Sequence, residues 1–359
     1  MDRQRVYSDV LRLQRIQMHW LCRVPAFALL ICLASLWACG RPGNGSVQRL
    51  ANSLTDIKIL ANAPSPLVTP TYDGSGQGMH PGIVAFESAW HGYRYWMAMT
   101  PYSNDSDRLE NPSILASQDG LNWEVPLGLA NPVAPYQPVH QMDPDLLYDA
   151  QTDQLWLYHL RGDTGGHTLL LRRTSSDGVH WSDEQVQFAI PYNTTVSPAI
   201  DKVGGTYKLW SVNPTCSGCS PGQNQVELRS STDGVNWTSP EVVNLRQTGY
   251  EVWHVEVEWV PAKNEYWALY AAYPDGANTG RTLLFFAKSS DGVNWTTFGR
   301  PILVPGSGWD ASQIYRSTFL YDESTDMLRV WYSAQHSQVW HTGYTELKYA
   351  TVLNYLSQP

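Results

Sequence analysis

The chain has 359 residues, of which 43% are hydrophobic and only 16% are charged, so it has ample material for a packed core and does not fit a disordered class. The formal net charge of -9 argues against a nucleic-acid partner, because such proteins need a basic surface. The composition includes 27 Gly, 23 Pro, 20 Tyr and 16 Trp, which favours many short strands joined by turns over long helices.

Residues 1–39 show the pattern of an export signal. Several arginines precede an apolar run from Val24 to Cys39, and this run is too short for a membrane span. It ends in Leu36-Trp37-Ala38-Cys39-Gly40, which resembles a bacterial lipobox, with Trp37 where a small residue is usual. The resemblance implies cleavage before Cys39, lipidation of Cys39, and an exported, lipid-anchored protein of the bacterial cell envelope, in the periplasm or on the cell surface. An ordinary signal peptide or an uncleaved anchor is the alternative.

Residues 40–77 are rich in small and turn-forming residues and are predicted to be a tether. Farther along, Cys216 and Cys219 lie in the segment Cys216-Ser217-Gly218-Cys219. In an exported protein this spacing favours a small-loop disulfide. A zinc site would need a second ligand pair, and a thioredoxin-like redox pair would need a βαβ context; the sequence shows neither.

A seven-residue signature organises the chain from residue 78 to 359. It occurs at Ser117–Trp123, Ser175–Trp181, Ser231–Trp237 and Ser289–Trp295, and reads Ser-x-Asp-Gly-x-x-Trp. Its Asp positions are 119, 177, 233 and 291, separated by 58, 56 and 58 residues, which suits one four-stranded propeller blade per repeat. The Asp can accept backbone N–H bonds in a tight turn, Gly supplies a positive φ, and Trp packs on a neighbouring sheet. The signature therefore predicts structure rather than catalysis.

Each repeat opens with one short strand and continues with an aromatic strand. The openings are His80–Val84, Asp143–Leu147, Ser197–Ile200, His254–Val257 and Arg316–Leu320, and the aromatic strands are Tyr95–Ala98, Leu155–Tyr158, Tyr207–Trp210, Tyr266–Leu269 and Leu328–Tyr332. Only the fifth lacks the signature. Five openings predict an all-β fold, a five-bladed β-propeller of four-stranded antiparallel blades, in residues 78–359. A strand near Tyr344–Val352, or residues before 78, would complete a shared blade.

The openings predict a site, because the first strand of each blade lines the central funnel. Aligned on the residue before Pro144, they form one ring of His80, Asp143, Ser197, His254 and Arg316. Side chains two residues farther along point the same way and form a second ring of Gly82, Asp145, Ala199, Glu256 and Thr318. One funnel would thus collect three carboxylates, two histidines and an arginine.

Paired carboxylates in a funnel suit glycoside hydrolysis, which needs one protonated and one ionised group. We expect Glu256 to be the acid and Asp143 the base or nucleophile, with Asp145 able to replace either. Arg316 would keep a carboxylate ionised or bind an acidic sugar. His254, Arg316, Glu110, Trp253 and Tyr315 are the expected substrate contacts, with interblade packing as the alternative for the aromatic residues and a strand-end hydrogen bond for Glu110.

Five blades, Pro-containing first strands and Ser-x-Asp-Gly-x-x-Trp turns together resemble the glycoside hydrolase superfamily of families 43, 32 and 68. Asp143-Pro144-Asp145-Leu146-Leu147-Tyr148-Asp149 is similar to the Asp-Pro openings of family 43. In that family the base is an Asp that opens the first blade, a second-blade carboxylate tunes the acid, and the acid is a Glu from a later blade. Here His80-Pro81 stands at the first of these positions. Either His80 acts as the general base or catalysis has been lost.

These observations predict an exported carbohydrate-active protein, a glycoside hydrolase that acts on an oligo- or polysaccharide. The alternatives are a non-catalytic carbohydrate-binding propeller and a lyase or metal-assisted enzyme. No cofactor is expected, although a metal held by His80, His254, Asp143 and Glu256 remains an alternative. We expect a monomer that binds no nucleic acid and reaches a membrane only through the lipid on Cys39.

The lipobox resemblance can be tested on the mature protein. Mass spectrometry of protein produced in a bacterial host should find a mature chain that starts at Cys39 and carries diacyl and amide-linked lipid, because one acyl chain alone binds a membrane weakly. An unmodified Cys39, or a different start, would contradict lipidation but not secretion.

Overall fold

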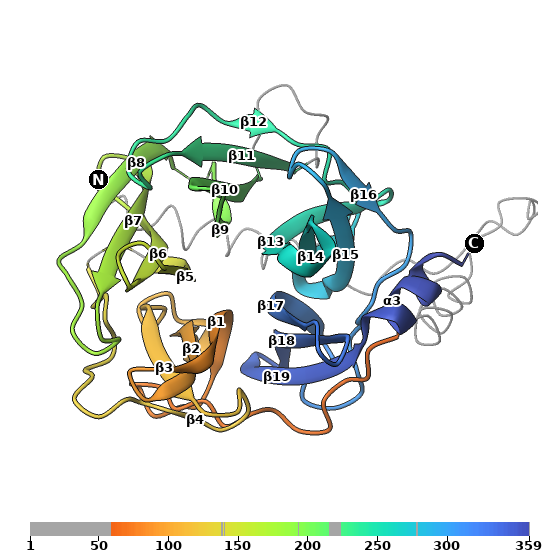
Figure 1. Cartoon of the computed structure of the whole chain (residues 1–359). Helices are drawn as coiled ribbons and strands as arrows, with labels where there is room; N and C mark the ends of the chain where they lie inside the picture. The colour runs from red at the N-terminus through yellow and green to blue at the C-terminus, as the bar shows by residue number, and fades with distance from the viewer. Residues whose placement is uncertain are drawn as a thin grey trace, which may run out of the picture. The chain divides into compact units, whose positions relative to one another are not determined.

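The computed structural model describes residues 59–137, 139, 141–192, 194–214, 224–277 and 279–358. The segment that contains Cys39 and the pair Cys216 and Cys219 lie outside these residues. The described part contains five antiparallel sheets that follow one another around a ring (Figure 1), which confirms the predicted five-bladed β-propeller. Within the described residues, no helix is long and apolar enough to cross a membrane.

The blades are used in chain order, and the first strand of each is the innermost (Figure 1). The first blade consists of β1 (Gly78–Trp90), β2 (Tyr93–Pro101), β3 (Ser113–Ser117) and β4 (Trp123–Glu124). The second consists of β5 (Gln141–Asp149), β6 (Gln154–Gly162), β7 (His167–Ser175) and β8 (Gln185–Pro191). The third consists of β9 (Val196–Val203), β10 (Thr206–Asn213), β11 (Gln225–Ser231) and β12 (Glu241–Val242).

The fourth blade consists of β13 (Tyr250–Val260), β14 (Glu265–Pro274), β15 (Leu283–Ser289) and β16 (Trp295–Thr297), and the fifth of β17 (Gln313–Asp322), β18 (Met327–His336) and β19 (Val339–Lys348). Short helices are η1 (Ser103–Asp105), η2 (Pro261–Lys263), η3 (Thr279–Arg281) and α3 (Tyr349–Leu356). The segment before β1 runs beside the fifth blade, since the Leu67 N–H donates to the Thr342 carbonyl at 2.8 Å. This contact ties the start of the propeller to its last strand.

The Asp-Gly turns join neighbouring blades through their glycines. A Cβ added to Gly178 would lie 2.2 Å from the ring of Trp96 in the preceding blade. Gly234, Gly292 and Gly120 are packed in the same way against Trp156, Trp210 and Trp331. The indole N–H of Trp210 donates to the Gly292 carbonyl at 2.8 Å, and that of Trp331 donates to the Gly120 carbonyl at 2.7 Å. The repeated glycine therefore provides space for the neighbouring tryptophan as well as its positive φ.

The Asp of each signature holds the turn in shape. In the first blade, Asp119 Oδ1 accepts backbone N–H bonds from Leu121 and Asn122, both at 2.8 Å. Although partial burial opposes it, this hydrogen bonding lowers the pKa of Asp119 to about 2. The signature is thus structural in the folded protein, as the sequence predicts.

In the fifth blade, a helix takes the place of the Asp-Gly turn that covers the tryptophan of the preceding blade. Trp267 in β14 has no following Asp-Gly turn to contact, and it stacks instead on Tyr349 at the start of α3, with ring centroids 4.0 Å apart. Lys263 lies over the same tyrosine ring, 5.5 Å from its centroid. The helix therefore covers the tryptophan that the missing signature leaves bare.

The close approach of Gly178 to Trp96 gives a stability prediction with a matched control. Gly178→Ala should lower the free energy of unfolding by about 2–4 kcal/mol, because a methyl group must displace a fully buried indole and adopt a positive φ. Gly166→Ala has a similar φ, 86° against 77°, but open space around it. Gly166→Ala should therefore lower the free energy of unfolding only by the cost of the backbone strain. If urea unfolding shows equal losses for both variants, the contact between Gly178 and Trp96 does not contribute to stability.

Candidate functional site

Every inner strand loses its regular pairing near its opening. The register between the first and second strands shifts between Met79 and Gly82 in β1, between Met142 and Asp145 in β5, and beside Ser211, which faces the opening of β9. In β13 the shift skips Trp253, and in β17 it skips Tyr315 and Arg316. Such bulges redirect side chains out of the sheet. They therefore bring the opening residues toward the axis of the ring.

Three of these openings also hold a strained backbone. His80, Asp143 and Ser197 have φ values of 57°, 50° and 54°, and each precedes a proline. A side chain at positive φ costs about 1–3 kcal/mol and persists only where its surroundings hold it. Strain at equivalent positions in three blades marks this ring as a candidate site.

Hydrogen bonds between blades hold the strained residues. Ser333 Oγ accepts from the His80 N–H at 3.0 Å and donates to the Arg316 carbonyl at 2.8 Å. Asp143 Oδ2 accepts from the Ser197 N–H at 2.8 Å. Ser197 Oγ in turn bonds both the N–H and the carbonyl of Val255, each at 3.0 Å. One set of bonds thereby links blades one and five, and a second set links blades two, three and four.

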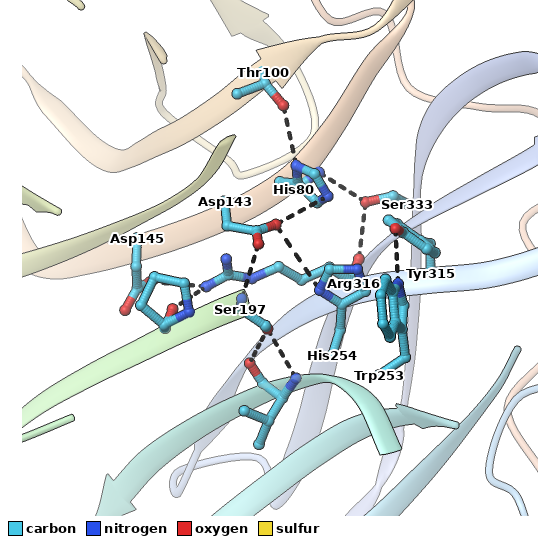
Figure 2. Close-up of polar contacts among 12 residues, drawn as sticks. His80, Thr100, Asp143, Asp145, Ser197, Trp253, His254, Tyr315, Arg316 and Ser333 are labelled. Carbon is cyan, nitrogen blue, oxygen red and sulfur yellow. Dashed lines mark hydrogen bonds and ion pairs between the residues drawn. The ribbon is translucent and has the colours of Figure 1, made fainter. Parts of the chain in front are cut away.

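His80, Asp143 and His254 converge into one cluster, named here the axial triad (Figure 2). His80 Nε2 lies 3.3 Å and His254 Nδ1 lies 3.9 Å from Asp143 Oδ1. One ligand atom from each residue lies within 4.8 Å of the other two, and each residue is at most 3% exposed. Two imidazoles and one carboxylate at this spacing can hold a divalent metal ion.

The second nitrogen of His80 has its own partners. Nδ1 lies 3.2 Å from Thr100 Oγ1 and 3.2 Å from Glu110 Oε1. A carboxylate only accepts hydrogen bonds, so the Glu110 contact favours the proton on Nδ1. Nε2 then directs a lone pair at Asp143 Oδ1 without making a hydrogen bond. A cation bound between the two atoms would relieve this repulsive contact.

His254 is also suited to hold a cation. Neither of its ring nitrogens has a hydrogen-bond partner among the described residues. Burial lowers the pKa of His254 well below its ordinary value; the charge of Asp143 opposes this shift, and His80 and Arg316 add smaller contributions to it. By contrast, the pKa of Asp143 is lowered: burial alone would raise it, but His80, His254 and Arg316 favour its ionised form. A neutral imidazole beside an ionised carboxylate is the state that binds a metal.

A second buried cluster lies beside the axial triad. The guanidinium NH2 of Arg316 donates to the Pro198 carbonyl at 2.6 Å and to Glu256 Oε2 at 3.3 Å, and it lies 3.8 Å from Asp145 Oδ1 (Arg316 and Asp145 are labelled in Figure 2). Arg316 is fully buried, and Glu256 and Asp145 are each 2% exposed. Blades two, three, four and five are thus joined by one side chain.

The carboxyl groups of this cluster bind protons readily. Burial raises the pKa of Asp145 to about 6 despite the nearby Arg316. Burial, reinforced by the charge of Asp145, raises the pKa of Glu256 well above its ordinary value. The pKa of Glu258, two residues farther along β13, is also raised well above its ordinary value, by burial first and then by the charges of Asp201 and Glu256. One guanidinium therefore faces more carboxyl groups than it can neutralise.

Aromatic side chains border the axial triad. The ring of Tyr315 meets His254 edge to face at 4.2 Å between centroids and lies 5.6 Å from the ring of His80. Trp253 Nε1 donates to the Tyr315 hydroxyl at 2.9 Å. Both side chains are only partly buried, whereas the three residues of the triad are buried.

The structure brings all the expected site residues to the axis, in two groups. His80, Asp143 and His254 meet with Glu110, Tyr315 and Trp253 around them, whereas Asp145, Glu256 and Arg316 pair with one another. The roles of Glu256 as acid and Asp143 as base stay predictions. Sequence reasoning missed Thr100 and Ser333, because each lies in a second strand at a position with no distinctive motif.

Comparison with known proteins extends this picture. No family model matches the chain. A type blood N-acetyl-α-D-galactosamine deacetylase of Flavonifractor plautii is 35% identical over 311 residues, which is 72% of this chain and 40% of that relative. The chain thus spans well under half the length of this curated relative. The crystal structure of an N-acetylgalactosamine deacetylase from F. plautii in complex with blood group B trisaccharide has a TM-score of 0.76 at 32% identity, covering 83% of this chain and 97% of that one.

A thermostable family-43 glycoside hydrolase has a TM-score of 0.56 at 14% identity, covering 77% of this chain and 92% of that one, which shows a shared fold. The predicted resemblance to the glycoside hydrolase propellers is thereby confirmed. The fold and its axial residues define a five-bladed propeller of the class found in carbohydrate-active enzymes. Within that class, the chain belongs to the family of the F. plautii N-acetylgalactosamine deacetylase.

The Arg316 cluster gives a prediction with a definite pH dependence. Arg316→Met should lower the free energy of unfolding by about 3–5 kcal/mol at pH 8, because it leaves buried carboxylates unpaired. Carboxyl groups with a raised folded-state pKa are protonated as the pH falls, so the loss should shrink at pH 5 and grow as the pH rises through that pKa.

Urea unfolding at both pH values measures this effect. Arg94→Met, on the exposed side of β2, is the control and should change stability little at either pH. A loss for Arg316→Met that is independent of pH would contradict the assignment of protonated carboxyl groups.

Proposed function

We propose that the protein is a metal-dependent carbohydrate deacetylase that removes the N-acetyl group of an amino sugar in an oligo- or polysaccharide. The observation that carries the proposal is the axial triad, in which buried ring nitrogens of His80 (Nε2) and His254 have no hydrogen-bond partner among the described residues and lie beside the Asp143 carboxylate. The F. plautii relatives, which are named as N-acetylgalactosamine deacetylases, support the substrate class. An N-acetylated galactose-type sugar is therefore the first substrate to test.

The side chains of the triad fit a catalytic metal. Two His and one carboxylate are a common set of three protein ligands that leaves a position open for water or substrate. A divalent ion bound there would polarise the amide carbonyl and lower the pKa of bound water. Asp143 would hold the ion with the charge that its lowered pKa preserves, and Ser197 fixes its second oxygen.

Glu110 and Thr100 are positioning residues in this proposal. Their contacts to His80 Nδ1 hold the ring so that Nε2 faces Asp143. A carboxylate behind a ligating His fixes its tautomer and increases its basicity. Glu110 would thus act through His80, in a role different from the substrate contact that the sequence suggests.

Glycoside hydrolysis by Asp143 and Glu256 is the second candidate, and one observation favours it. The raised pKa of Glu256 is the property that a general acid requires. Against it, one carboxylate oxygen of Glu256 accepts a hydrogen bond from Arg316. In the deacetylase proposal, Glu256 and Asp145 hold Arg316 and have no part in the chemistry.

The two candidates differ in the product and in the sensitive residue. The purified protein, treated with chelator and reloaded with Zn²⁺, should release acetate from N-acetylated glycans and should leave their glycosidic bonds intact. Asp143→Asn should lose nearly all of this activity, whereas Glu256→Gln should keep most of it. Release of reducing sugar that depends on Glu256 would instead establish the glycoside hydrolase.

Metal binding is tested apart from activity. His254→Ala should retain the fold but bind Zn²⁺ at least about 100-fold more weakly in calorimetric titration, because one of three ligands is lost. His336→Ala, an exposed histidine at the end of β18, is the matched control and should bind as the unaltered protein does. Unchanged zinc affinity in His254→Ala would refute the axial metal site.

A further inference from the structure

Tyr315 borders the axial triad at a place where no chemistry has yet been assigned to it. It lies in the bulge of β17, directly before Arg316, and its ring touches both histidines of the triad (Figure 2). The bulge matters because it turns this side chain out of the regular pairing of the sheet. Tyr315 thus lies beside the axial triad.

The hydroxyl of Tyr315 has a defined orientation. Its oxygen accepts a hydrogen bond from the indole N–H of Trp253 at 2.9 Å, and an indole cannot accept one in return. The hydroxyl makes no other hydrogen bond to the residues that the structure describes. Its proton is therefore free to point at a bound substrate.

The geometry suits the hydroxyl to act as a donor. Its oxygen already accepts the hydrogen bond from Trp253, and a phenol O–H group is a hydrogen-bond donor. The Trp253 bond also polarises the O–H group, since linked hydrogen bonds strengthen one another.

We infer that Tyr315 is a catalytic residue that donates a hydrogen bond to the carbonyl oxygen of the scissile acetamide. The inference rests on the proposed deacetylation. Water forms a bond to the carbonyl carbon, and the displaced electron pair moves to the carbonyl oxygen, where the Tyr315 hydroxyl stabilises the negative charge. When the C–N bond breaks, its electron pair goes to nitrogen, both protons of the attacking water end on the sugar amine, and acetate leaves as its anion. Tyr315 donates a hydrogen bond and transfers no proton.

Trp253 is a positioning residue in this arrangement. Its indole N–H occupies one lone pair of the phenol oxygen and thereby directs the O–H bond away from itself. Tyr273 packs on Trp253 at 6.3 Å between centroids and limits how the indole can turn. A ring without the N–H would leave the hydroxyl free to rotate.

Removal of the hydroxyl alone tests the donor role. Tyr315→Phe in the zinc-loaded protein should lower kcat for acetate release by about 10²–10³-fold, the usual effect of losing one oxyanion donor, with KM little changed. Zinc affinity and the melting temperature should stay as in the unaltered protein. Tyr93→Phe, whose hydroxyl bonds Glu124 on the exposed outer part of the first blade, is the matched control and should keep full activity.

Two further measurements separate a donor from a merely structural tyrosine. An N-trifluoroacetyl substrate forms a more stable oxyanion, so the deficit of Tyr315→Phe should shrink on that substrate, whereas loss of structure would reduce both rates equally. Trp253→Phe should lower kcat by a smaller factor than Tyr315→Phe. The double variant should then be no slower than Tyr315→Phe alone, since the indole acts through the hydroxyl.

The possible outcomes distinguish this inference from the proposed function. Acetate release by the unaltered protein with near-normal kcat in Tyr315→Phe overturns the donor role and leaves the deacetylase in place. Loss of zinc binding in Tyr315→Phe, or an equal deficit on both substrates, also overturns it. If the zinc-loaded, unaltered protein releases no acetate from any N-acetylated glycan, the proposed function and this inference both fail.

Discussion

The site depends on inner strands that interrupt their own pairing at the axis. Proline follows His80, Asp143 and Ser197, and it removes the N–H that a regular ladder would use. The preceding residue is held at positive φ, and its side chain turns from the sheet toward the neighbouring blade. The strain, about 1–3 kcal/mol at each position, is offset by hydrogen bonds that exist only when the ring is closed. Closure of the propeller and assembly of the site are therefore one event.

The two clusters at the axis differ in their electrostatics. In the axial triad the pKa of Asp143 is lowered, because interactions with His80, His254 and Arg316 outweigh its burial. In the neighbouring cluster burial raises the pKa of Asp145 to about 6 and, together with the charge of Asp145, raises that of Glu256 well above its ordinary value. Asp143 and Asp145, two positions apart on one strand, thus have pKa values shifted in opposite directions because their neighbours differ. This contrast is what favours metal chemistry at Asp143 and a structural role for Glu256.

Much of the fold could be predicted from local sequence. Spacing of the Ser-x-Asp-Gly-x-x-Trp signature predicts the number of blades, and Asp119 and Gly178 act locally as turn chemistry requires. The aligned openings also predict which side chains meet at the axis. What the signature does not reveal is that its glycine receives the tryptophan of the preceding blade, because that contact joins residues of different repeats. The stacking of Tyr349 on Trp267, which replaces the missing fifth turn, could not be predicted from the sequence for the same reason.

By itself, the sequence determined the all-β class, the five blades and the set of polar residues at the axis, since periodicity and turn chemistry act over a few residues. Only the tertiary structure decided how that set divides. Strand alternation places Asp143 and Asp145 on one face, but the bulge between them sends one to the histidines and the other to Arg316. The proximity of Glu110 to His80, and of Tyr315 to His254, was likewise decided by ring closure. Distance in space, burial and the charge of non-local neighbours set the chemistry of each group, and none of these is a property of a short stretch of sequence.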